Sequence, residues 1–107
     1  MIETIATEQG AAICKITTSG NHTATGAAVE LPGSGLRVLQ VRCAKGMLFC
    51  GIFDKTFLTD RHIPAAVFSA PSFDEMMKRK PNFLTDEAKA LGANLDMTGE
   101  QIVDALS

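Results

Sequence analysis

The chain has 107 residues, which is enough for one domain and too few for two. Ten Lys and Arg residues against twelve Asp and Glu residues give a net charge of −2, which removes the electrostatic case for binding nucleic acid. Hydrophobic residues make up 46% of the chain, as in folded globular proteins, and no apolar run approaches the roughly 18 residues of a membrane span.

The sequence carries no signal for export and no motif of a common enzyme class. Its N-terminal residues lack the basic start and apolar core of a signal peptide, so we expect a cytoplasmic protein. Cys14, Cys43 and Cys50 are an odd number without a CxxC pair, and we expect reduced thiols. No phosphate-binding loop, dinucleotide fingerprint, serine-hydrolase elbow or zinc-ligand spacing is present. The residues therefore indicate no metal and identify no cofactor.

The composition changes midway along the chain. Residues 1–53 hold 7 of the 22 charged side chains and 14 of the 22 Val, Ile and Thr residues. Residues 54–107 hold the other 15 charged side chains and most of the helix signals. This pattern predicts a strand-rich first half and a helix-rich second half. Because the chain is short, we interpret the change as two structure types within a single domain, 1–107.

Turn residues divide the first half into apolar, β-branched segments. The predicted strands are Ala12–Thr18, His22–Leu31, Leu36–Cys43 and Met47–Phe53, with Met1–Thr7 as a weaker candidate. The last two of the four flank a tight turn and predict an antiparallel hairpin. Their near-continuous apolar runs predict a sheet covered on both faces.

The second half begins with a helix and a strand. Asp54 is placed to cap a helix over Lys55–Arg61, and the apolar segment Ala65–Ala70 follows. Parallel pairing of this segment with Met47–Phe53 would complete a β-α-β unit with a right-handed crossover. Further helices are expected after the capping residues Ser72, Thr85 or Asp86, and Thr98. We therefore predict an α+β fold: N-terminal antiparallel β hairpins, then a β-α-β unit, then short C-terminal helices packed on the sheet.

Cys50, Gly51 and Asp54 form the candidate functional site. They lie where a predicted strand meets the N-terminus of a helix, and ligands of α/β structures bind at the carboxyl ends of parallel strands. Free N–H groups there could hold an anion or lower the pKa of the Cys50 thiol, and Gly51 would permit close approach. The alternative is that Cys50 is a small buried hydrophobe, Gly51 a packing residue and Asp54 only a cap.

The histidines and the basic run are weaker candidates. His62 is the candidate base for Cys50, but it follows the helix and so belongs at the opposite end of the β-α-β unit. His22 is expected to be exposed in a hairpin turn. The run Lys78-Arg79-Lys80 favours a solvated helix end over an anion site. The residues expected in the core are Cys14, Cys43, Phe73, Met76 and Met77.

Several short motifs follow one another along residues 24–106. Val29-Glu30-Leu31-Pro32 precedes an apolar strand, Lys45-Gly46, three apolar residues, Cys50-Gly51 and Asp54. Ala88-Lys89-Ala90-Leu91-Gly92 and Met97-Thr98-Gly99-Glu100-Gln101 close the series. This ordered set resembles the YunC-like family, a domain of unknown function in bacteria and archaea. Two segments depart from the family pattern: the N-terminus through about Asn21 is longer, and residues 78–83 replace a shorter, less basic link.

The resemblance implies an α+β domain whose N-terminal β region forms tetramers. The low charge of residues 1–53 agrees with a surface buried between copies. The resemblance implies no activity, but the Cys-Gly pair followed by Asp is the family's most distinctive signature. It therefore strengthens the case that Cys50 has a role beyond packing.

Three hypotheses remain open from the sequence. In the first, the protein is a small cytosolic homo-oligomer, a tetramer assembled through its N-terminal strands, and binds a small anionic ligand near Cys50, Gly51 and Asp54. In the second, it is a thiol enzyme with Cys50 as nucleophile or redox centre, and His22 or His62 of another subunit supplies the base. In the third, it is a purely structural subunit of a larger complex.

Overall fold

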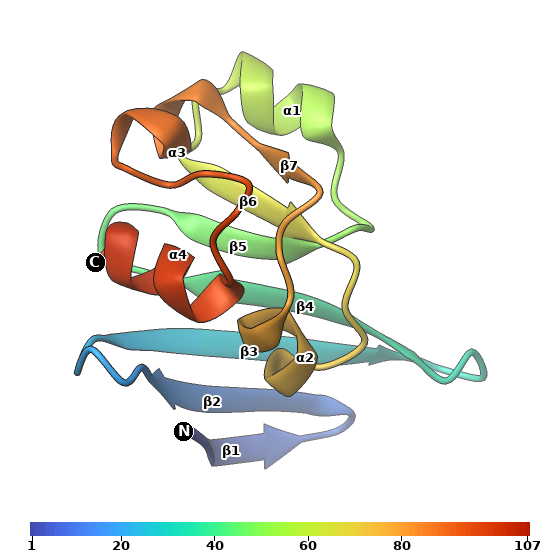
Figure 1. Ribbon diagram of the computed structural model, residues 1–107. Coiled ribbons are helices and arrows are strands. Elements are labelled where there is room, and N and C mark those ends of the chain that lie inside the picture. The colour runs from blue at the N-terminus through green and yellow to red at the C-terminus, as the bar shows by residue number, and fades with distance from the viewer.

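Seven strands form one sheet in which every strand lies beside its neighbour in the sequence, as the computed structural model of residues 1–107 shows (Figure 1). Pairing is antiparallel from β1 through β5, parallel between β5 and β6, and antiparallel between β6 and β7. The strands are β1 (Ile2–Glu8), β2 (Ala11–Thr17), β3 (Thr23–Leu31), β4 (Leu36–Arg42), β5 (Met47–Cys50), β6 (Ala65–Phe68) and β7 (Phe83–Leu84). The predicted hairpins, β-α-β unit and α+β class are confirmed.

Four short helices begin at the expected capping residues. They are α1 (Lys55–Asp60), α2 (Phe73–Lys78), α3 (Asp86–Ala90) and α4 (Gly99–Ala105), and their N-caps are Asp54, Ser72, Thr85 and Thr98. Thr98 and Gln101 form a reciprocal capping box. At Ser72 only the serine half forms, because the Glu75 carboxylate pairs with Arg79 at 3.2 Å. None of the four helices is long and apolar enough to cross a membrane.

The strands of the β-α-β unit end earlier than their apolar runs predict. The strand β5 ends at Cys50 rather than Phe53, because the chain turns there and the Phe53 N–H donates to the Cys50 carbonyl at 3.3 Å. The strand β6 ends at Phe68 rather than Ala70. The strand β7 was not predicted, since two residues are too few to display an alternating pattern.

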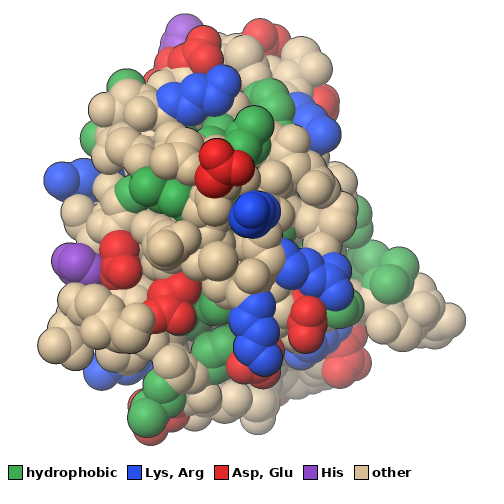
Figure 2. Space-filling model, in the orientation of Figure 1, with side chains coloured by type: hydrophobic (Ala, Val, Ile, Leu, Met, Phe, Trp, Pro, Cys, Tyr) green, Lys and Arg blue, Asp and Glu red, His purple; other side chains and the backbone are tan.

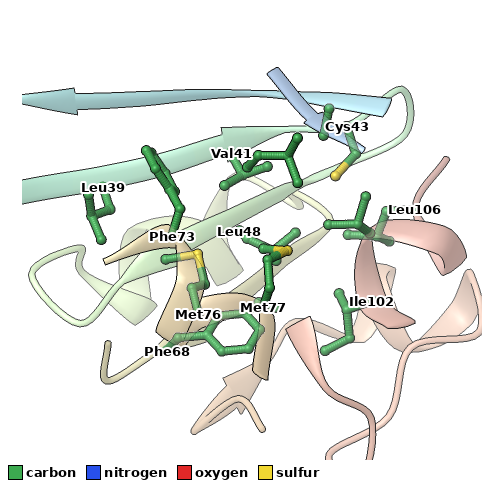
Figure 3. Packing of buried hydrophobic residues seen from close by; sticks show 14 of the residues in the cluster. Leu39, Val41, Cys43, Leu48, Phe68, Phe73, Met76, Met77, Ile102 and Leu106 are labelled. Carbon is green, nitrogen blue, oxygen red and sulfur yellow. The ribbon is translucent and has the colours of Figure 1, made fainter. Parts of the chain in front are cut away.

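The larger hydrophobic core lies between the sheet and the helices α2 and α4 (Figure 1, Figure 3). The two helices approach so closely that a Cβ placed on Gly99 would lie 2.0 Å from the Met76 carbonyl oxygen. The core residues that Figure 3 labels are Leu39, Val41, Cys43, Leu48, Phe68, Phe73, Met76, Met77, Ile102 and Leu106. Cys14 also lies in this core, so the predicted packing residues are confirmed.

A smaller core covers the other face, but only at β5 and β6. Leu58 of α1 packs there with Phe49, Ala65 and Val67. The helix α1 has six residues and does not extend over β1–β4. The prediction of a sheet covered on both faces is therefore right for β5 and wrong for β4, where the alternate residues Val38, Gln40 and Arg42 stay partly or fully exposed.

We call the uncovered side of β1–β4 the open face. Strand alternation and register place on it Ile13, Lys15, Thr25, Ala27, Val29, Val38, Gln40 and Arg42. Ile13 is 40% exposed and Val29 is 48% exposed, although both occupy interior strands of the sheet.

Candidate functional site

The Cys50 thiol lies at the carboxyl end of β5 and belongs to the larger core. Its residue is 6% exposed, and its Sγ accepts a hydrogen bond from the Leu39 backbone N–H at 3.3 Å. Cys50 pairs with Phe68 of the parallel strand β6. The thiol is thus at the predicted junction of strand and helix, but it faces packed side chains.

Gly51 and Asp54 follow on the loop that leads to α1. A Cβ placed on Gly51 would meet only the Phe68 carbonyl oxygen, at 3.7 Å, which is an ordinary van der Waals distance. The Asp54 carboxylate accepts the Thr56 N–H at 2.9 Å and so acts as the helix cap. None of the four surface hollows of the structure is lined by Cys50, Gly51 or Asp54.

His62 is not brought to Cys50. The parallel register pairs Met47 with Ala65 and Cys50 with Phe68, so His62 lies at the end of β6 that is remote from Cys50. Its Nδ1 lies 3.0 Å from a carboxylate oxygen of Glu87. This hydrogen bond is the main reason why the pKa of Glu87 is lowered.

A polar network joins the β2–β3 turn to α4. His22 Nδ1 lies 2.8 Å from Asp104 Oδ1, and the same oxygen accepts the Thr18 hydroxyl at 2.5 Å. Next to it, the Ser19 N–H and hydroxyl both donate to Glu100. His22 is exposed in the turn, as expected. Its pairing with Asp104 was not predicted, because the partner lies 82 residues away and no local pattern indicates it. The network fastens the hairpin to the helix.

A second cluster, which we call the Ser69 cluster, consists of Ser69, Arg79 and Asn82 and lies just beyond the carboxyl end of β6. Arg79 Nη1 donates to the Ser69 carbonyl at 2.6 Å, and Asn82 Nδ2 donates to the Ser69 hydroxyl at 2.5 Å. From β4, Arg37 Nη2 reaches the Pro71 carbonyl in the same loop at 3.4 Å. The cluster is beside the junction, because Phe68 pairs with Cys50.

The Ser69 cluster was missed because the basic run 78–80 has the composition of any solvated helix end. Arg79 is indeed the C-cap of α2, but its guanidinium folds back to the loop that precedes the helix. The available sequence signal was the Ser69 and Asn82 pair on either side of α2. Only the pairing of β6 with β7 brings those two positions together.

Comparisons with known proteins identify a fold and no family. No family model and no curated protein matches the chain. Its structure is similar to the crystal structure of TA1206, a protein of unknown function from Thermoplasma acidophilum, with a TM-score of 0.79 and 20% sequence identity over 95% of this chain and 100% of that one. At this identity the likeness establishes the α+β fold.

Proposed function

We propose that the chain is the subunit of a homo-oligomer, a tetramer, which assembles through the open face of β1–β4. The observation that carries this proposal is the exposure of Ile13 and Val29 in the middle of a sheet. Ala27 lies beside Ile13 and Val38 beside Val29 in register, so the four side chains form one apolar patch. Such a patch on an interior part of a sheet is typical of a surface that another chain covers.

The hairpin of β3 and β4 extends the same surface. It projects from the body of the protein (Figure 1, Figure 2), and its terminal pair, Leu31 and Leu36, points to the open-face side. Leu36 is 61% exposed. The four strands have seven to nine residues and make a face only about 20 Å on each side, whereas a stable interface buries roughly 800 Å² per partner. The projecting hairpin supplies the additional area.

The charges of the open face favour a second copy as its occupant. Glu8 lies at one end of the face, next to the β1–β2 turn, while Lys15 and Arg42 lie at the other end together with Glu3, which pairs with Lys15 in register. None of these side chains makes an ion pair within the chain, so the two ends carry opposite net charges. In a two-fold pair that reverses the strand direction, the acidic end of each copy meets the basic end of the other.

Light scattering coupled to size-exclusion chromatography at micromolar concentration tests this proposal. We expect the wild-type protein to be an oligomer, and Val29→Glu to release monomers because it buries a charge at the interface. Leu95→Glu is the matched control, since Leu95 is 49% exposed but lies in the loop between α3 and α4. A wild-type protein that is monomeric under these conditions would overturn the proposal.

The second part of the proposal is a small anionic ligand at the junction that contains Cys50, Gly51 and Asp54. Its support is the position of the junction at the carboxyl end of a parallel strand pair, with Arg37 and Arg79 reaching the adjacent loop. The alternative, a thiol enzyme that uses Cys50 as nucleophile or redox centre, has less support because the thiol is buried and no histidine approaches it. The three unpaired cysteines favour a reducing, cytoplasmic location.

A further inference from the structure

We infer that the Ser69 cluster binds a small oxyanion of the phosphate or sulfate class. This inference deepens the ligand-binding part of the proposed function, because it names the groups that would hold the anion. It does not depend on self-association. It also places the ligand beside β6 rather than at the Cys50 thiol.

The guanidinium of Arg79 is held in place while most of its donors stay free. Its Nε donates to Glu75 at 3.2 Å and its Nη1 donates to the Ser69 carbonyl at 2.6 Å. A guanidinium carries five N–H donors, so three of them have no protein partner. Two fixed contacts orient the planar group, and less conformational entropy is therefore lost when an anion binds.

Ser69 and Asn82 add neutral donors next to this guanidinium. The Ser69 oxygen accepts from Asn82 Nδ2 at 2.5 Å, so the Ser69 hydroxyl proton remains available to an acceptor. The second N–H of the Asn82 amide is also unused. The Asn82 backbone N–H donates to the Val67 carbonyl at 2.7 Å, which fixes the residue against β6. Both side chains are exposed.

The free groups of the cluster are mostly donors, which suit the acceptor oxygens of an oxyanion. They are three N–H groups of Arg79, the Ser69 hydroxyl proton and one Asn82 amide N–H, against one free acceptor, the Asn82 amide oxygen. An oxyanion offers only acceptor oxygens, and charge-assisted bonds from a guanidinium are among the stronger hydrogen bonds in proteins. Groups that bind a cation would instead present carboxylate or carbonyl oxygens. The one carboxylate at the cluster, Glu75, is already engaged with Arg79.

The local charge agrees with an anionic ligand, although the whole protein is negative. Lys80 follows Arg79 in the chain and takes part in no ion pair, whereas Lys78 lines a hollow with Asp74 and Glu100. Over residues 74–80, Lys78, Arg79 and Lys80 outnumber Asp74 and Glu75, so the segment has a net positive charge. Lys and Arg side chains accordingly gather over α2 and the chain beyond it, with acidic side chains among them (Figure 2). The cluster thus combines a fixed guanidinium with a locally positive field.

Titration with inorganic phosphate, followed by amide chemical shifts at constant ionic strength, tests the inference. We expect the amides of residues 69–72 and 79–82 to shift, with a dissociation constant of about 1 mM, as suits a shallow exposed site. Arg79→Gln should weaken binding by about tenfold. Arg61→Gln is the matched control, because Arg61 is also the C-cap of a six-residue helix and its removal should leave binding unchanged.

Two further variants test whether phosphate recognises the geometry of the cluster, rather than its charge alone, and whether weaker binding arises without loss of the fold. Arg79→Lys keeps the charge but loses the planar fork, and it should weaken phosphate binding almost as much as Arg79→Gln. Ser69→Ala removes one free donor while Arg79 still contacts the main-chain carbonyl, so the fold is retained and binding should weaken by about threefold.

The outcomes distinguish the inference from the proposed function. Equal weakening by Arg79→Gln and Arg61→Gln would mean that phosphate responds to net charge alone, which would overturn the inference. Shifts confined to residues 50–55 would also overturn it and leave the proposed ligand site at Cys50 standing. The absence of any shift up to about 50 mM phosphate would reject both.

Discussion

The backbone N–H of Leu39 donates a hydrogen bond to the Sγ of Cys50 at 3.3 Å, where the ladder between β4 and β5 ends. The sulfur thus serves a buried donor that would otherwise lack a partner. Because Cys50 is 6% exposed, its first role is to complete the end of β5. Any reaction at this thiol requires the loop that follows it to open.

Alkylation rates measure that opening directly. In the native protein we expect iodoacetamide to modify Cys50 about a hundredfold more slowly than in urea, because a buried thiol reacts only through local unfolding. Mass spectrometry of peptides from partly modified protein assigns the rate to each cysteine. Rapid native modification of Cys50, with Cys14 and Cys43 protected, would instead support the thiol-enzyme alternative.

Two glycines in different surroundings should respond very differently to alanine. A Cβ on Gly99 would lie 2.0 Å from the Met76 carbonyl oxygen, so α2 and α4 must separate, and we expect Gly99→Ala to lower the free energy of unfolding by at least about 2 kcal/mol. The Cβ of Gly51→Ala would make only an ordinary van der Waals contact, so this variant should change the free energy of unfolding by less than about 0.5 kcal/mol. Urea unfolding monitored by circular dichroism provides both values.

Gly51→Ala also has an informative opposite outcome. If the variant is as stable as the wild-type protein but no longer binds phosphate, then a ligand approaches the Gly51 backbone closely, as the absence of a side chain there would permit. If it is strongly destabilised, then the loop between β5 and α1 is packed more tightly than its 3.7 Å distance to the Phe68 carbonyl indicates.

Local sequence signals located most of the fold. Asp54 and Thr98 could be identified as caps because their side-chain oxygens serve N–H groups only two or three residues ahead. Turn residues and β-branched segments likewise located β1 to β4, because these signals also come from residues that are close together in the sequence. These local signals do not show how far a helix extends over the sheet. For this reason the open face of β4 was wrongly predicted to be covered.

The site residues were less predictable, since their partners are distant in the sequence. Cys50 was placed correctly at its junction, but the direction of its side chain depends on how β5 is registered against β4. The pairing of His22 with Asp104 depends on how α4 packs beside the β2–β3 turn. The Ser69 cluster likewise exists only after β6 and β7 have paired.

The contact between Ser19 and Glu100 predicts a titration that can be tested. The Ser19 hydroxyl and N–H lower the pKa of the Glu100 carboxyl from its ordinary value of 4.5. We expect Ser19→Ala to raise this pKa, as followed by the side-chain carboxyl carbon in NMR spectra. Ser34→Ala is the control, because Ser34 bonds only within the β3–β4 turn.

The sign of the effect on stability follows from the same shift. A carboxyl whose pKa is lowered in the folded state contributes stability above its unfolded pKa, and this contribution is lost as the pH falls through the folded pKa. Acid should therefore destabilise the wild-type protein slightly more than Ser19→Ala, at pH values near and below 4.5. An unchanged Glu100 titration in Ser19→Ala would show that the contact does not persist in solution.

Cys43 makes the corresponding prediction at alkaline pH. Burial raises the pKa of its thiol from 9.0 to about 11, and the nearby charge of Arg42 opposes this only in part. The folded state therefore keeps the thiol protonated between pH 9 and 11, while the unfolded chain releases the proton. The contribution of the Cys43 thiol to the free energy of unfolding is fully present below pH 9. It is lost as the pH rises towards 11, and it amounts to about 1.4 kcal/mol for each unit of pKa difference between the folded and unfolded states.

Comparison of the wild-type protein with Cys43→Ala isolates this contribution, since lysines titrate equally in both. The variant should be less stable at pH 7, by about 1 kcal/mol for the atom removed from the core, but it should lose less stability between pH 9 and 11. Val41→Ala is the control, because it also removes buried core atoms but leaves the Cys43 thiol in place, so it should follow the wild-type slope. Parallel curves for the wild-type protein and Cys43→Ala would contradict this prediction, because they would mean that the folded state accommodates the Cys43 thiolate as readily as the unfolded chain does.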